Sequence, residues 1–71
     1  MSIKVGDYIK KVRKNHFRIY HIIDITNTNG ISGIIIASNY KVVFKKGNII
    51  RQIRPYGYEK LSRNEVIMEL L

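Results

Sequence analysis

The chain has 71 residues and no cysteine, which is below the usual domain size of about 100–150 residues and excludes a two-domain enzyme. The lack of cysteine excludes a disulfide framework and a thiolate metal site, and no apolar run is long enough for a secretory or membrane-spanning segment, so a cytoplasmic protein is predicted. Thirteen Lys and Arg residues against five Asp and Glu give a formal net charge of +8, and this excess predicts an anionic partner.

The first element is predicted from the segment VGDYI at residues 5–9. Its Gly-Asp pair suits a strand that enters or leaves a tight bend, because Gly accepts positive φ and Asp caps turns. The strand is expected to continue to about Val12. The stretch from Lys10 to His16 is too highly charged for a core, and it predicts a loop or a protruding edge.

Residues 17–25 follow a period close to two, which is typical of a strand with one buried face. One face carries Phe17, Ile19, Ile23 and Ile25, and the other carries Arg18, Tyr20, Asp24 and Thr26. Asn29 and Gly30 then predict a hairpin with a type I′ turn. The return strand is predicted over residues 31–37, where consecutive isoleucines indicate burial on both faces or a kink at Gly33.

Residues 40–45 alternate again and predict a fourth strand, and a second hairpin loop is expected at residues 46–48. Its partner strand is predicted over residues 49–53, before Pro55 and the linker at residues 56–58. A helix follows over residues 63–71, because Ser62 and Glu65 form a capping box and Leu61 and Val66 have the spacing of a hydrophobic staple. The apolar stripe that is expected to dock this helix on the sheet consists of Val66, Ile67, Leu70 and Leu71.

These elements predict a single domain over residues 1–71 that is mainly β, a small five-stranded antiparallel barrel with a short C-terminal α-helix. Residues 3–54, with the VGDYI opening, a charged loop and three successive hairpin strands, resemble the SH3-like small barrels. The resemblance implies a small barrel of the kind found in nucleic-acid-associated proteins and in many small phage proteins.

Few residues of the chain favour catalysis. The acids are Asp7, Asp24, Glu59, Glu65 and Glu69. The last two are expected on the solvent side of the helix. His16 and His21 are five residues apart and therefore lie on opposite faces of a strand, which argues against a shared metal ion. His21 is expected to be partly buried and hydrogen-bonded. The sequence predicts no enzyme, no metal and no cofactor.

The basic residues form two clusters, six between Lys4 and Arg18 and six between Lys41 and Lys60, with none in residues 19–40. In a small barrel the first loop and a later hairpin commonly lie on the same side, so we expect one positive surface. Codon usage in an A+T-rich genome is an alternative source of the lysines, but it does not explain the scarcity of acids. The tyrosines that are candidates for stacking on bases are Tyr40, Tyr56 and Tyr58, and the alternative for each is packing with its hydroxyl at the rim.

Two functions are compatible with this composition. The first is a non-enzymatic module that binds DNA or RNA through phosphate contacts. The alternative is a small phage-type protein that binds and modulates an acidic host protein, such as a polymerase, a nuclease or a defence factor, in the host cytoplasm. The helix lacks the basic face of a membrane-surface helix, so no membrane partner is predicted. The candidate binding residues are Lys10, Lys11, Arg13, Lys14, Arg18, Lys41, Lys45, Lys46, Arg51, Arg54, Tyr56 and Tyr58.

Overall fold

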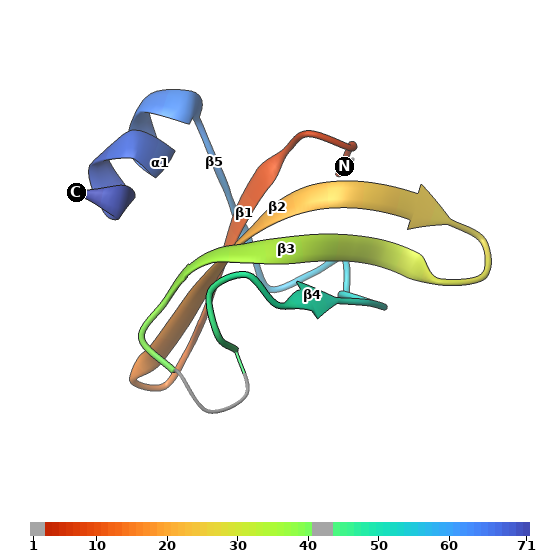
Figure 1. Ribbon diagram of the computed structural model, residues 1–71, viewed down its shortest axis with the longest axis horizontal. Helices are drawn as coiled ribbons and strands as arrows, with labels where there is room; N and C mark the ends of the chain where they lie inside the picture. Colours follow the sequence, from red (N-terminus) through yellow and green to blue (C-terminus); the bar gives the residue numbers. More distant parts are fainter. Residues whose placement is uncertain (1–2, 41–43) are drawn as a thin grey trace.

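A computed structural model describes residues 3–40 and 44–71 and shows one antiparallel sheet followed by a helix (Figure 1). Its described elements are β1 (Tyr8–Arg13), β2 (His16–Thr26), β3 (Gly30–Ser38), β4 (Ile49–Ile50), β5 (Glu59–Leu61) and α1 (Arg63–Leu70). The strand order is β4-β3-β2-β1-β5. The predicted class, mainly β with a C-terminal helix, is confirmed. Among the described residues no pairing joins the edge strands β4 and β5, so closure into a barrel stays a prediction.

The chain enters β1 through a tight bend, as the Gly-Asp pair predicts. Gly6 has a φ of 97°, and the backbone N–H of Lys4 donates to Oδ2 of Asp7 at 2.8 Å. That hydrogen bond and the nearby Lys60 ammonium, 3.2 Å from the same carboxylate oxygen, hold the pKa of Asp7 below its usual value. The bend therefore sets where pairing between β1 and β2 begins.

Most of the charged stretch from Lys10 to His16, which was predicted to be a loop or a protruding edge, forms the hairpin of β1 and β2. The two strands pair from Tyr8 opposite His21 to Arg13 opposite His16, and only residues 14–15 form the turn. Figure 1 shows that the turn end of this hairpin projects from the sheet. The basic residues of β1 consequently alternate between two faces, because successive side chains of a strand point to opposite sides.

Strand β2 does not have the single buried face that its alternation predicts. Ile19, Tyr20 and Ile22 are all buried, whereas Ile23 and Ile25 are 40% and 42% exposed. The register shift between Ile22 and Asp24 leaves Ile23 as an extra residue of β2 and changes the side to which later residues of the strand point. The middle of β2 is also covered on both sides, so neither of its faces is polar.

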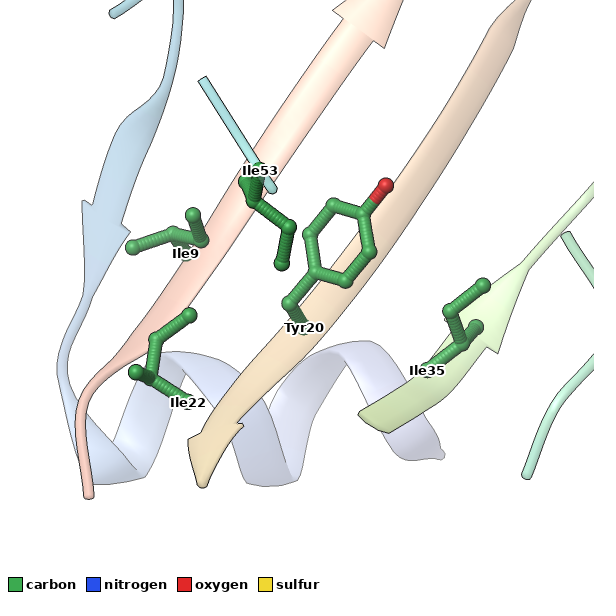
Figure 2. Close-up of a cluster of buried hydrophobic side chains, with 5 residues drawn as sticks. All are labelled: Ile9, Tyr20, Ile22, Ile35 and Ile53. Carbon is green, nitrogen blue, oxygen red and sulfur yellow. The ribbon is translucent and has the colours of Figure 1, made fainter. Parts of the chain in front are cut away.

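Two hydrophobic clusters lie on opposite faces of the sheet. The cleft face, shown in Figure 2, buries Ile9, Tyr20, Ile22, Ile35 and Ile53. The helix face buries Ile19, Leu61 and Val66. Figure 2 shows α1 beyond the strands, on the side away from the cleft-face cluster. Each face therefore has its own cover, the helix on one side and the segment that carries Ile53 on the other.

Residues 51–58 lead from β4 at one edge to β5 at the other and supply the cover of the cleft face. Strand β4 is shorter than the predicted strand over residues 49–53, because Gln52 has a φ of 56° and interrupts it. The N–H of Ile53 nevertheless donates to the carbonyl of Ile31 at 2.9 Å. A Cβ at Gly33 would lie 3.1 Å from Cδ1 of Ile53 and 3.1 Å from Cβ of Tyr20. Gly33 thus provides the space in which Ile53 packs.

The first predicted hairpin is confirmed with a different turn type, and the second predicted hairpin loop forms a turn that no described strand precedes directly. Thr26 pairs with Gly30, which leaves a three-residue loop at residues 27–29. Only Gly30 of the Asn-Gly pair has positive φ, at 65°, so the type I′ assignment is wrong although the hairpin is confirmed. In the second turn Gly47 has a φ of 95°, and the N–H of Asn48 donates to the carbonyl of Lys45 at 3.0 Å.

The predicted strand over residues 40–45 is not seen as such. Positions 41–43 lie outside the described residues, and the flanking Tyr40 and Phe44 do not belong to a strand. The fifth strand is instead β5, which pairs with β1. Its three residues are too few to show a period of two, so alternation did not predict this strand.

The N-terminus of α1 has the predicted capping box. The Ser62 hydroxyl accepts the N–H of Glu65 at 3.2 Å, and the Glu65 carboxylate accepts the N–H of Ser62 at 2.8 Å. The hydrogen bonds with Ser62 lower the pKa of Glu65. Leu61 and Val66, the predicted staple, are both buried in the helix-face cluster.

The apolar stripe of α1 docks only in part, which corrects the prediction. Val66 is 5% exposed, but Ile67 and Leu70 are 52% and 51% exposed and Leu71 is 94% exposed. The helix is two turns long and follows the edge strand β5, so only a narrow face is turned to the sheet (Figure 1). That face includes Glu69, three residues after Val66. None of the helices in residues 3–40 and 44–71 has the length and apolar character needed to cross a membrane.

Candidate nucleic-acid interface

A cleft of about 570 Å³ opens on the cleft face, between the β1–β2 hairpin and residues 50–57. Among its lining residues the cations are Lys11, Arg13, Arg18 and Arg54 and the aromatic rings are Tyr20, Phe44 and Tyr56. No carboxylate occurs among the described residues that line it. The cleft therefore combines concentrated positive charge with aromatic surface.

Arg18 is the most firmly held of these cations. Its Nε donates to the hydroxyl of Tyr20 at 2.7 Å, and the guanidinium carbon lies 4.2 Å from the ring centroid of Phe44. The Tyr20 ring is buried, and Figure 2 shows its hydroxyl at the end away from the backbone. Arg18 is itself half-buried, yet no carboxylate of the described chain forms an ion pair with it. Its guanidinium is thus oriented before any ligand arrives.

Lys11 connects β1 to the segment over the cleft face. Its Nζ donates to the carbonyl of Arg54 at 2.8 Å and lies 5.8 Å from the ring centroid of Tyr56. Burial lowers the pKa of Lys11, and the positive charges of Arg18 and Arg54 lower it further. The cations of the cleft therefore repel one another, and a bound anion would relieve this repulsion.

Arg54 and Tyr56 form the outer side of the cleft. Nη1 of Arg54 donates to the hydroxyl of Tyr56 at 2.9 Å, and Tyr56 is 60% exposed. Both residues follow Ile53, whose burial in the cleft-face cluster fixes the start of their segment. Their positions thus depend on the same packing that covers the sheet.

The predicted merging of the two basic clusters holds for part of each cluster. Lys11, Arg13 and Arg18 come from the first, and Arg54 with Tyr56 comes from the second. These five of the twelve candidate residues line one cleft. Six of the others lie elsewhere, and Lys41 is outside the described residues.

Lys10 lies on the helix face, although it is adjacent to Lys11 in sequence. Its Nζ contacts Oε1 of Glu69 at 2.6 Å and lies 5.1 Å from the ring centroid of Phe17. Glu69 is exposed, as predicted, yet it lies close enough to the sheet to pair with Lys10. Lys45 and Lys46 also line a groove on the helix face, which they share with Glu69. Lys10 is thus paired with a carboxylate, and none of these three lysines lines the cleft.

The remaining candidates have different surroundings. Lys14 is exposed in the turn of the first hairpin, and Arg51 is exposed outside the cleft lining. Tyr58 is half-buried against the cleft-face cluster, so its ring has a packing role. Lys41 lies outside the described residues. Tyr40, the other tyrosine considered for stacking, lies 4.3 Å from His16 between ring centroids.

Sequence analysis missed two groups of the cleft, Phe44 and the hydroxyl of Tyr20. A signal for Tyr20 was present, since strand alternation places it on the same face as Arg18, two residues earlier. Phe44 had no such signal, because it was interpreted only as an apolar position of a strand.

Other chemistry has little support in the described part of the chain. No group of three or more His, Asp or Glu residues there could hold a metal ion. His21 is half-buried and stacks on Tyr8, with ring centroids 4.5 Å apart. Comparisons with protein-family models, with curated proteins and with solved structures found no match. The assignment of a function therefore depends on the chemistry of the cleft.

Proposed function

We propose that this protein is a non-enzymatic module that binds DNA or RNA through phosphate contacts in the cleft. The observation that carries the proposal is the convergence of Lys11, Arg13, Arg18 and Arg54 on a cleft that no carboxylate lines among the described residues. A nucleic-acid backbone carries one negative charge per nucleotide, so adjacent cations can bind successive phosphates and release their counterions.

The surroundings of Arg18 and Lys11 support this function. Arg18 offers a planar group of donors that suits phosphate oxygens, and its contacts with Tyr20 and Phe44 reduce the conformational entropy that binding would cost. The lowered pKa of Lys11 indicates that positive charge at this place is electrostatically unfavourable without an anion. Both features favour an anionic ligand over an uncharged one.

An acidic protein is the second candidate partner, and one observation favours it. Tyr56 lines the cleft and is 60% exposed, as is usual for an aromatic residue that becomes buried in a protein interface. A protein interface concentrates its free energy in a few anchors, whereas phosphate contacts spread it over several cations. Substitution of individual cations therefore distinguishes the two partners.

The test uses Lys10 and Lys11, which are adjacent in sequence and lie on opposite faces. A labelled oligonucleotide is titrated with wild type, Lys11→Gln and Lys10→Gln at several salt concentrations. We expect Lys11→Gln to weaken binding and to reduce the slope of log affinity against log salt by about one unit. Lys10→Gln removes the same charge on the helix face, and it should leave the slope nearly unchanged.

Two results would contradict the proposal. Absence of binding even at low salt would exclude nucleic acid as the partner and favour the acidic protein. Equal losses in the two variants would show that the overall charge of the protein, and not the cleft, attracts the oligonucleotide.

A further inference from the structure

Tyr56 is the ring of the cleft that has a large free surface. Tyr20 is 2% exposed and offers only its hydroxyl. Phe44 is half-buried, and the guanidinium of Arg18 lies over its ring. Tyr56 is 60% exposed although Lys11 lies over its ring and Arg54 binds its hydroxyl. The part of the ring away from Lys11 is therefore open to a flat ligand.

Two cations of the cleft lie beside this ring. Lys11 and Arg54 both contact Tyr56 directly, so a base stacked on the open part of the ring would have its phosphate beside two positive charges. Aromatic rings bind bases by stacking only where a base face is free. In a duplex interior both faces of each base are already stacked on neighbouring bases, and only the phosphates remain accessible.

We propose that the cleft binds single-stranded nucleic acid, with a phosphate between Lys11, Arg18 and Arg54 and the adjoining base stacked on Tyr56. This inference rests on the proposed function and specifies its ligand. A duplex can bring its phosphates to the cations but has no free base face for the ring of Tyr56, whereas a single strand can supply both. The preference is independent of base identity, because every base has a face that can stack.

The experiment compares three probes of equal length and label at one salt concentration, namely an oligo(dT) strand, an abasic strand and a duplex. The abasic strand has the same backbone charge as oligo(dT) and lacks the bases, so the difference between them isolates stacking. We expect wild type to bind oligo(dT) about tenfold more tightly than the abasic strand. It should also prefer oligo(dT) to the duplex.

Tyr56 is then replaced in two ways. Tyr56→Leu should reduce the preference for oligo(dT) over the abasic strand to nearly onefold, while its affinity for the abasic strand stays close to that of wild type. Tyr56→Phe loses the hydrogen bond from Arg54 but keeps the ring, so it should keep most of the preference. Thermal unfolding of both variants verifies the fold, and the exposure of Tyr56 predicts little change.

The outcomes separate this inference from the proposed function. If wild type binds all three probes equally with a steep salt dependence, the proposed function stands and the single-strand preference is wrong. The same holds if Tyr56→Leu keeps the full preference for oligo(dT). If none of the probes binds at low salt, both proposals are wrong.

Discussion

The positive charges on the two faces of the sheet have different neighbours, and Lys10 and Lys11 show this contrast most directly. On the helix face Lys10 has a carboxylate partner, Glu69, at 2.6 Å. On the cleft face Lys11 has only a carbonyl, an aromatic ring and two arginines as neighbours among the contacts described. A high net charge therefore does not by itself identify a binding surface. For Lys10 and Lys11, the side of the strand on which the lysine lies decides whether a carboxylate neutralises it.

The covers of the two faces explain this difference. The helix face is covered by α1, which brings Glu69 close to the sheet. The cleft face is covered by residues 51–58, which contain two arginines and no acid. Disruption of α1 and disruption of residues 51–58 should therefore affect different properties of the protein.

The largest effect is expected for Ile53→Ala. Ile53 is 6% exposed and packs among the five residues of the cleft-face cluster. Removal of a buried isoleucine side chain beyond Cβ costs about 2–5 kcal/mol, and a core of this size supplies only about 3–5 kcal/mol. Urea denaturation should show a partly unfolded protein. A variant as stable as wild type would contradict the role of Ile53 as the anchor of residues 51–58.

Gly33→Ala tests the same packing from the strand side. The added Cβ would lie 3.1 Å from Ile53 and 3.2 Å from the carbonyl oxygen of His21, so side chains and backbone must both move. Overpacking of this kind costs about 1–3 kcal/mol. We also expect oligonucleotide affinity to fall, because displacement of Ile53 shifts Arg54 and Tyr56. Unchanged stability and affinity would show that the position of residues 51–58 does not depend on the packing of Ile53 against Gly33.

Ser62→Ala tests the cover of the helix face and should have a smaller effect. Loss of the cap costs about 1 kcal/mol. Because the backbone N–H and the hydroxyl of Ser62 lower the folded pKa of Glu65, the contribution of the Glu65 carboxylate is present at neutral pH and is lost as the pH falls through the carboxylate range. The variant keeps the N–H and loses only the hydroxyl, so it should lose slightly less stability on acidification than wild type does. Its oligonucleotide affinity at neutral pH should stay unchanged, and a parallel loss of affinity would contradict the separation of the two faces.

Sequence patterns predicted the elements whose signals are local. The capping box at Ser62 and the turns at Gly30 and Gly47 depend on neighbouring residues, and all three appear at the predicted places. Strand β5 and the two register shifts of β2 depend on partners distant in sequence, so alternation alone predicted neither. Ile23 is the extra residue at the second shift and is exposed, whereas Tyr20 is buried because residues 51–58 cover its face.

The candidate site was predicted at the level of composition but not of geometry. The two basic clusters were visible in sequence, and part of each meets in the cleft. Which lysines are neutralised was not visible, because the partner of Lys10 is a glutamate 59 residues later. The path of residues 51–58 across the sheet could not be predicted from sequence either, since it depends on how Ile53 packs over Gly33.

The smallest predicted effect is a pH dependence of binding that arises from Lys11. Burial and the neighbouring charges of Arg18 and Arg54 place its pKa below the ordinary value of 10.5, so this lysine loses its proton earlier than an exposed one as the pH rises. An anion favours the charged form, which means that binding is strongest below the pKa of Lys11 and weakens as the pH passes through it. Oligonucleotide affinity should therefore decline at a lower pH than the ordinary lysine pKa of 10.5 would give.

Lys11→Arg isolates the contribution of this residue, because a guanidinium keeps its charge over the whole range. We expect the variant to bind at neutral pH with an affinity near that of wild type and to lose less of it as the pH rises. Lys10→Arg is the matched control on the helix face and should retain the decline of wild type. If Lys11→Arg and wild type lose affinity in parallel, the titrating group lies outside the cleft, and Lys11 is then not among the cations that bind phosphate.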